Sequence, residues 1–178
     1  SLTPIITKIL ELIKVEKCPA LKNNNISQFG FRANSSTLHA EAILLDTIQY
    51  YNSKDTPVYI CSLDAEKAFD CCNWLTLLRK LPERDIPNIV NAFLIKLYLN
   101  GSAIIHYSDN YSKTFNLTQG VRQGRILSPY LYNIYTEDLL QSIKSLKIGT
   151  FLSNDLHTAI IAYADDIILL STCLSHLQ

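Results

Sequence analysis

Apolar residues repeat along this chain with two different periods, which together predict both helices and strands. From Leu2 to Ile13 they recur at spacings of three and four, the pattern typical of a helix. Pro4 falls in the predicted first turn, where the missing N–H does no harm, and Pro19 follows the predicted end. The chain is therefore expected to begin with a helix.

A second helix is predicted after Ser35 or Ser36, because either side chain can cap a helix amino terminus. The helical pattern ends near Asn52. Its predicted apolar face consists of Leu38, Ala42, Leu45 and Ile48.

Three further helices are predicted downstream. Asn73 can cap a short helix that runs through Leu81, and Pro87 opens another. Ser128-Pro129 begins a third that continues through Leu146. The predicted inner face of the helix after Pro87 consists of Ile86, Val90, Phe93, Leu94, Leu97 and Tyr98.

Strand-like runs lie between these helices. One extends from Val58 to Leu63, and alternating runs at 103–107 and 113–117 flank Ser108-Asp109-Asn110, which suits a hairpin. The apolar run 159–170 predicts two more short strands joined by a turn. Helices mixed with a small, largely antiparallel sheet predict the α+β fold class.

Composition narrows the class of protein. The chain has 178 residues, 48% of them apolar, which suits one globular domain with a substantial core. Sixteen basic residues balance sixteen acidic ones, so the strongly cationic surface of a free-standing nucleic-acid binder is absent. A polyanionic partner would have to meet a local basic patch or segments outside this chain.

Cysteines and apolar runs exclude other classes. The five cysteines form no C-x-x-C pair, so neither a zinc module nor a disulfide framework is expected. No signal peptide is visible, and reduced, intracellular thiols are the default. The longest apolar stretch is interrupted by two aspartates, each costing roughly 2.5 to 3.5 kcal/mol at a bilayer centre, so no membrane association is expected.

The strongest chemical signal is the pair Asp165-Asp166 inside the apolar run 159–170. An unpaired carboxylate in apolar surroundings costs several kcal/mol, so the pair needs a turn at the surface, a cation, or both. Taken alone, the pair is equally consistent with a solvated turn. Two short strands would place both carboxylates at the tip of a hairpin.

A second acidic position follows the strand 58–63. Asp64 ends that strand and can meet Asp165 and Asp166 if the two strands are neighbours in one sheet. Taken alone, Asp64 is more often a cap or loop residue than a ligand. Three converging carboxylates favour Mg²⁺ or Mn²⁺, and two such ions about 3.5 to 4 Å apart would support in-line phosphoryl transfer.

These segments resemble the motifs of reverse transcriptases, in the style of non-LTR, LINE-like retrotransposon enzymes. Tyr163-Ala164-Asp165-Asp166 is similar to the catalytic signature, and residues 63–70 resemble the first aspartate motif. Residues 120–133 are similar to the segment between those two motifs. Residues 29–32 and 36–40 match the upstream fingers motif. Arg125 departs from the pattern, because a small or acidic residue is more usual there.

The resemblance implies a right-hand polymerase with fingers and palm that copies RNA into DNA with two divalent ions, Mg²⁺ or Mn²⁺. It implies that Asp64, Asp165 and the Ala65 carbonyl hold the metals and that Asp166 completes the triad. Phe69 would lie under the incoming sugar and clash with a 2′-hydroxyl, although simple core packing is its alternative. The remaining nucleotide contacts implied are Arg32, Ala68, Gln123 and Gly124.

The resemblance covers the whole chain as one reverse transcriptase domain fragment, 1–178. Residues of about 1–57 and 75–125 are assigned to fingers and palm elements, and 58–74 and 126–172 to the palm with its catalytic motifs. The implied partners are an RNA template, a DNA primer and a dNTP substrate, in the nucleus or cytoplasm. A thumb and an endonuclease segment are expected elsewhere in a parent polyprotein.

Two other functions remain open at this point. One is a catalytically inactive, truncated or domesticated retroelement remnant that binds nucleic acid or protein. The other is a viral RNA-copying polymerase, which Ala164 disfavours because glycine is usual before the aspartate pair in that class.

Overall fold

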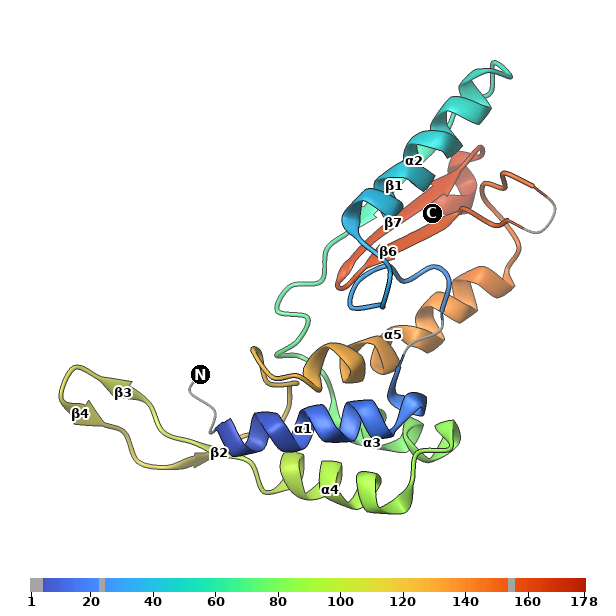
Figure 1. Cartoon of the computed structure of the whole chain (residues 1–178). Helices are drawn as coiled ribbons and strands as arrows, with labels where there is room; N and C mark the ends of the chain where they lie inside the picture. Colours follow the sequence, from blue (N-terminus) through green and yellow to red (C-terminus); the bar gives the residue numbers. More distant parts are fainter. Residues whose placement is uncertain (1–4, 23–24, 154–155) are drawn as a thin grey trace. The chain divides into compact units, whose positions relative to one another are not determined.

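The computed structural model describes residues 5–22, 25–153 and 156–178 (Figure 1). The helices are α1 (Ile5–Lys17), α2 (Thr37–Asn52), α3 (Trp74–Lys80), α4 (Asn88–Leu99) and α5 (Ser128–Ser145). The strands are β1 (Tyr59–Leu63), β2 (Ser102–Ala103), β3 (His106–Tyr107), β4 (Asn110–Tyr111), β5 (Phe115–Asn116), β6 (Ile160–Tyr163) and β7 (Asp166–Ser171). Short 3-10 helices occupy Pro19–Leu21, Pro82–Arg84 and Leu174–Leu177.

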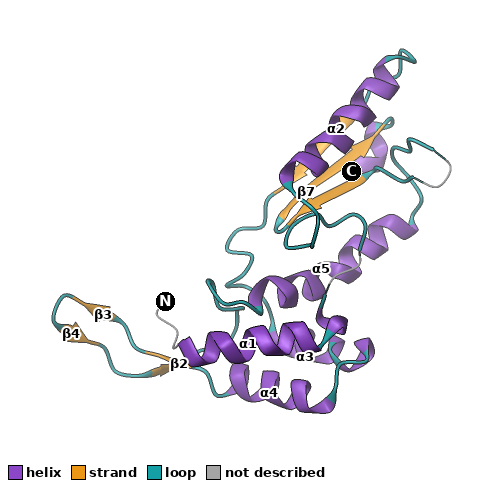
Figure 2. Ribbon diagram, in the orientation of Figure 1, coloured by secondary structure: helices purple, strands orange, loops and turns teal. Residues whose placement is uncertain are grey.

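The chain forms two compact units. The helical unit comprises the described residues of 1–22 and 67–135, and the sheet unit comprises those of 23–66 and 136–178. The secondary structure differs accordingly, with α1, α3 and α4 in the first unit and β1, β6 and β7 in the second (Figure 2).

The sheet unit is built on a three-stranded antiparallel sheet in the order β1-β7-β6. Alternate residues of the apolar run lie in two different core clusters. Ile161 and Leu170 pack with Phe29 and Ala40, whereas Ile160 and Ala162 pack in the other cluster with residues that include Leu140 of α5. Both faces of the hairpin are therefore covered, which explains why its sequence is apolar at consecutive positions.

The helical unit has its own core, to which α4 contributes its inner face. Val90, Leu94 and Tyr98 are buried there, with Ile86 just before the helix, as the sequence predicted. Trp74 joins the same core, and its indole Nε1 donates a 2.7 Å hydrogen bond to the carbonyl oxygen of Gly120.

The predicted apolar face of the second helix is wrong. On α2, Leu38 and Leu45 are 71% and 56% exposed, and the buried positions are Ala40 and Thr47. On α1, where the sequence predicted a helix without assigning its packing face, most apolar side chains are exposed, while Glu11 and Val15 are buried. Both helices carry apolar residues on more than one face, so periodicity alone does not select the face that packs. Residues 1–4, including Leu2 and Pro4, lie outside the described residues.

Capping and turn predictions are confirmed. Ser36 forms a capping box with His39, whose Nδ1 accepts from the Ser36 amide at 3.2 Å. Asn73 accepts from the Thr76 amide at 3.1 Å. The hairpin around residues 108–110 forms as two short ladders, β3 with β4 and β2 with β5.

The exclusions drawn from sequence can be compared with the structure. All five cysteines are free thiols. Among the described residues, no helix combines the length and apolar character needed to cross a bilayer.

Candidate active site

The aspartate pair lies at the tip of the β6–β7 hairpin, as predicted. The ladder ends with Tyr163 opposite Asp166, so Ala164 and Asp165 form a two-residue turn. Ala164 has a positive φ of 58°, whereas Asp165 does not share this conformation, a combination found in type II′ turns. Asp165 is half-buried and Asp166 is exposed, so neither carboxylate lies within the apolar core.

Asp64 approaches the same end of the sheet from the neighbouring strand. β1 pairs with β7 in antiparallel register, and the last pair joins Leu63 to Ile167. The next position along each strand is Asp64 on one side and Asp166 on the other. Since directly opposite residues of an antiparallel pair project to the same face, the register favours proximity of these two carboxylates. The expectation that the two strands are neighbours is confirmed.

The donor set fits a hard divalent cation in its chemistry and in the backbone positions of its members. Asp64, Asp165 and Asp166 supply carboxylate oxygens, and the Ala65 carbonyl follows Asp64 in the exposed loop after β1. In the described part of the chain, no three His, Cys, Asp or Glu side chains are already close enough to hold an ion together. Like-charged carboxylates repel one another, and a bound cation would offset this repulsion.

The turn is held by a residue that the sequence analysis missed, Gln28. Its side chain is fully buried, and its Oε1 accepts hydrogen bonds from the amides of Ala164 at 2.9 Å and Gly30 at 2.8 Å. Its Nε2 donates to the carbonyl oxygen of Ala164 at 3.1 Å. The only local signal was its place next to the Phe29-Gly30 motif, which does not reveal what a glutamine contacts 136 residues away.

The predicted nucleotide-binding residue Phe69 belongs to the helical unit. Its ring stacks on that of Tyr132, with centroids 4.6 Å apart, and its carbonyl oxygen accepts from the Val121 amide at 2.7 Å. Phe69 and its neighbour Ala68 are half-buried against the core of this unit. Core packing therefore accounts for part of the Phe69 surface, while its role toward a sugar stays a prediction.

The loop that carries Gln123 and Gly124 is fixed to the same region. Both residues are exposed, and a Cβ placed on Gly124 would meet nothing within 4 Å, although its φ of 76° favours glycine. A Cβ on Gly120 would lie 2.7 Å from the Asp70 carbonyl oxygen. The loop thus runs close to the segment after Phe69 and leaves open space at Gly124 for a ligand.

Arg125, the residue that departs from the family pattern, is buried within this loop. Its Nη1 forms a 2.7 Å ion pair with Oε1 of Glu11, which is itself fully buried. Glu11 Oε2 also accepts from the amides of Ile126 and Leu127, at 3.1 and 3.5 Å. This arrangement supplies a reason for arginine at a position where the family usually has a small or acidic residue.

The remaining predicted contact, Arg32, lies in the sheet unit. Its Nη1 is 3.4 Å from the Asn25 carbonyl oxygen and 3.5 Å from that of Ile26, both long for hydrogen bonds. The side chain is half-buried, and its assignment to a triphosphate stays a prediction.

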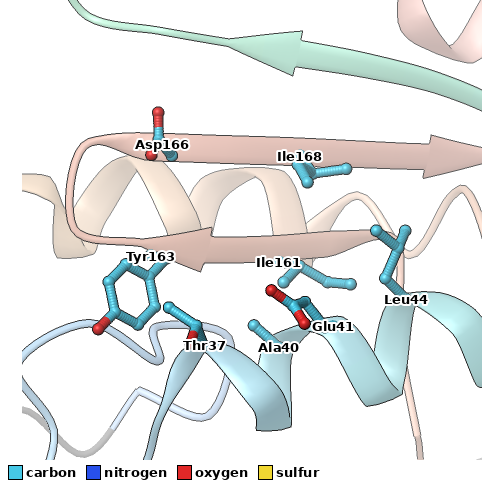
Figure 3. Close-up of a pocket in the computed structure, with 8 residues that line it drawn as sticks. All are labelled: Thr37, Ala40, Glu41, Leu44, Ile161, Tyr163, Asp166 and Ile168. Carbon is cyan, nitrogen blue, oxygen red and sulfur yellow. The ribbon is translucent and has the colours of Figure 1, made fainter.

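A pocket of about 200 Å³ lies between α2 and the hairpin (Figure 3). This volume is below the roughly 300–1,000 Å³ typical of sites that enclose a drug-sized ligand. The pocket is therefore too small to enclose a nucleotide. Its lining residues are Thr37, Ala40, Glu41, Leu44, Ile161, Tyr163, Asp166 and Ile168.

Comparison with known proteins identifies the class to which this fold and these motifs belong. The sequence matches the family described as reverse transcriptase (RNA-dependent DNA polymerase) over residues 1–178. The chain therefore belongs to the reverse transcriptase family.

The similar curated proteins include products of non-LTR retrotransposons. The chain is 26% identical over 166 residues to the retrovirus-related Pol polyprotein from type-1 retrotransposable element R2 of Popillia japonica, a match that covers 92% of this chain and 23% of that protein. It is 32% identical over 154 residues to the probable RNA-directed DNA polymerase from transposon X-element of Drosophila melanogaster, covering 82% of this chain and 16% of that protein. The chain thus spans less than a quarter of the length of either relative.

Solved structures share the fold at low sequence identity. Telomerase from Candida tropicalis, in complex with a TWJ fragment of telomeric RNA, matches with a TM-score of 0.65 at 15% identity, covering 97% of this chain and 29% of that one. Apo telomerase from the same organism, truncated from its C-terminal domain, gives 0.64 at 16% identity, covering 95% of this chain and 34% of that one. The predicted α+β, right-hand polymerase fold is confirmed.

Proposed function

We propose that this chain is the catalytic part of an RNA-directed DNA polymerase of a non-LTR retrotransposon. It transfers dNMP from a dNTP to the 3′-hydroxyl of a DNA primer, guided by an RNA template. The observation that carries the proposal is the β1–β7 register, which ends with Leu63 opposite Ile167 and so aligns Asp64 with Asp166. Family membership over the whole chain supports the same reaction.

Each acidic residue has a defined task in this proposal. Asp64, Asp165 and the carbonyl of Ala65 hold two Mg²⁺ or Mn²⁺ ions, and Asp166 completes the acidic set. When bound, the ions stabilise the attacking and leaving oxygens of an in-line displacement. The strained turn at Ala164 keeps the side chain of Asp165 at the hairpin tip, outside the apolar core.

The proposed nucleotide contacts are those implied by the family resemblance. Phe69 excludes the 2′-hydroxyl of an rNTP, and Gln123, Gly124 and Ala68 contact the sugar or base from the helical unit. Arg32 binds triphosphate oxygens, a task suited to a planar guanidinium. Lys67 has a left-handed φ of 52°, a conformation found in backbone nests that bind phosphate groups.

The proposal also assigns the wider setting of the chain. Fingers and palm elements occupy the ranges predicted from the sequence, and the protein acts in the nucleus or cytoplasm on a template-primer duplex. Both assignments are carried over from the family resemblance and stay predictions.

Primer extension on an RNA template with Mg²⁺ or Mn²⁺ tests the acidic set. Asp64→Asn and Asp165→Asn should each reduce dNMP incorporation by about 10²-fold to 10³-fold or more, because each removes a charge that holds the ions. Asp46→Asn is the matched control, since Asp46 is an exposed aspartate on α2 of the same unit. Synthesis unaffected by Asp165→Asn would refute the mechanism. Template-primer binding that persists in chelator without incorporation would favour an inactive binding protein.

Sugar selection tests Phe69 separately. Phe69→Val should raise rNTP incorporation relative to dNTP, because the smaller side chain removes the clash with the 2′-hydroxyl. Phe115→Val is the control, since Phe115 lies in the β2–β5 ladder of the same unit and is 43% exposed. An unchanged rNTP-to-dNTP ratio in folded Phe69→Val would leave Phe69 as a packing residue only.

A further inference from the structure

The Gln28 side chain makes three hydrogen bonds, two with Ala164 and one with Gly30. Both polar atoms of its side-chain amide hydrogen-bond to Ala164 in the turn. Oε1 accepts from the Ala164 amide at 2.9 Å, and Nε2 donates to the Ala164 carbonyl at 3.1 Å. Oε1 also accepts from the Gly30 amide at 2.8 Å. A buried side chain that is hydrogen-bonded on both sides of one residue fixes the orientation of both flanking peptide groups.

The backbone around Gln28 is itself fixed to β6. The Ala162 amide donates to the Ser27 carbonyl and the Phe29 amide donates to the Ala162 carbonyl, both at 2.8 Å. Gln28 forms a parallel bridge with Ala162. The segment is thus anchored along the hairpin edge, which leaves the Gln28 side chain little freedom to leave the turn.

Gly30 closes this arrangement from the same segment. A Cβ added at Gly30 would lie 2.3 Å from the Ala164 amide nitrogen and 3.0 Å from Gln28 Oε1. No real side chain fits such a gap, so only glycine lets the segment approach the turn. The sequence Gln28-Phe29-Gly30 therefore combines a hydrogen-bonding side chain with a position that must lack one.

The turn needs external support because its conformation is unfavourable. Ala164 has a φ of 58°, and a non-glycine residue in this region costs on the order of 1–3 kcal/mol unless its surroundings hold it there. Asp165 follows directly, so rotation at Ala164 would redirect the first carboxylate of the pair.

We infer that Gln28 is a positioning residue for the aspartate pair, holding the Ala164–Asp165 turn in the geometry in which the carboxylates bind metal. The inference rests on the proposed function for its metal step, but the hold on the turn is a property of the chain alone. Glutamine suits this task because it is neutral. A carboxylate at position 28 would lack the Nε2 donor and would add negative charge to a turn that already carries two aspartates.

The direct test is amide hydrogen exchange at Ala164. Gln28→Met keeps the length and burial of the side chain but removes all three hydrogen bonds, so exchange of the Ala164 amide should become at least tenfold faster. Thr47→Val is the matched control, because Thr47 is buried in α2 of the same unit and bonds only the Ile43 carbonyl. Unchanged Ala164 protection in Gln28→Met would overturn the inference.

A second measurement follows Mn²⁺ binding by electron paramagnetic resonance. Loss of a group that orients metal ligands typically lowers metal affinity about 10–100-fold, so Gln28→Met should raise the Mn²⁺ Kd by that factor. Thr47→Val should leave the Kd unchanged. In primer extension, Gln28→Met should lower kcat at saturating metal with little change in the KM for dNTP. A Kd and kcat equal to those of the parent chain would overturn the positioning role.

Gly30→Ala provides an independent route if Gln28→Met fails to fold. The added methyl group should displace the turn, so it should reproduce the faster Ala164 exchange and the weaker Mn²⁺ binding. Normal exchange and binding in Gly30→Ala would count against the inference.

Failure of the proposed function is distinguishable from failure of this inference. Asp165→Asn should weaken Mn²⁺ binding while leaving Gln28 and the Ala164 protection in place. If the parent chain binds no Mn²⁺ and extends no primer, the proposed function falls. Amide hydrogen exchange at Ala164 then tests by itself whether Gln28 holds the turn.

Discussion

The two units each fix a motif-bearing turn with one buried polar side chain, but the two side chains differ in charge. In the sheet unit, neutral Gln28 satisfies donors and an acceptor around Ala164. In the helical unit, Glu11 holds the loop before α5 and is balanced by Arg125. We call Gln28 the neutral clamp and Glu11, with its partner Arg125, the charged clamp. Replacing Gln28 leaves no buried charge, whereas replacing Glu11 leaves Arg125 without its buried counter-ion. Replacing Gln28 should therefore mainly change the geometry of its turn, whereas replacing Glu11 should mainly lower the free energy of unfolding.

The largest expected effect comes from breaking the charged clamp. Glu11→Leu should reduce the free energy of unfolding by about 3–5 kcal/mol, because the buried Arg125 loses its partner. Chemical denaturation provides the measurement, and Glu16→Leu on the exposed side of α1 is the control. Adding Arg125→Met should recover much of the loss. Equal losses of unfolding free energy in Glu11→Leu and Glu16→Leu would contradict the proposed role of the charged clamp in stability.

An intermediate effect is expected at alkaline pH. Burial raises the pKa of the Cys72 thiol from 9.0 to about 12 and that of the Tyr98 hydroxyl from 10.0 to about 12. The stability that these two protonated groups contribute is complete below their pKa values in the unfolded chain, 9.0 and 10.0. It is lost as the pH rises toward 12, because the unfolded chain releases these protons first. Each group should lower the free energy of unfolding by about 1.4 kcal/mol per pH unit in its window.

Denaturation between pH 8 and pH 11 measures this decline, and both groups belong to the helical unit. Tyr98→Phe should make the decline shallower above pH 10, and Cys72→Ala should do so from pH 9. In the sheet unit, exposed Cys173 has a lowered pKa because Ser175 hydrogen-bonds to it, so it should not contribute a decline of this sign. A slope unaffected by both substitutions would show that other groups cause the alkaline loss.

The smallest expected effect compares helix caps in the two units. Asn73→Ala removes the bond to the Thr76 amide in the helical unit, and Ser36→Ala removes the hydroxyl that contacts His39 Nδ1 at 3.3 Å within the capping box of the sheet unit. Each should cost about 1 kcal/mol. Amide exchange should locate each loss in the first turn of its own helix, α3 or α2. Ser35→Ala is the control, and a loss from it equal to that of Ser36→Ala would contradict the capping assignment.

Local patterns predicted the parts of the fold that depend on neighbouring residues. The Asp165-Asp166 pair could only leave the apolar run at a turn, so it fixed the ends of β6 and β7. The inner face of α4 was also predicted, because its apolar residues form one continuous stripe. Adjacency of β1 and β7 was the condition under which Asp64 would lie near that pair, and the register meets this condition.

Both clamps escaped prediction because each depends on a distant partner. Gln28 lies 136 residues from Ala164, and Glu11 lies 114 residues from Arg125. A buried glutamate also contradicts the local rule that places charge on the exposed side of a helix, so local sequence does not indicate that Glu11 is buried. The pairing that makes such burial tolerable is visible only in three dimensions.

The order of strands in the sheet has a consequence for how the sheet can be extended. At the β6 edge of the sheet, the backbone of residues 27–29 hydrogen-bonds to the outward-facing amide and carbonyl of Ala162. At the other edge, β1 pairs with β7 on one side and with no further strand of the described part of the chain on the other. Outward-facing peptide groups are what an additional strand needs. Any lateral growth of this sheet, from a further segment or from another molecule, therefore has β1 as its available side.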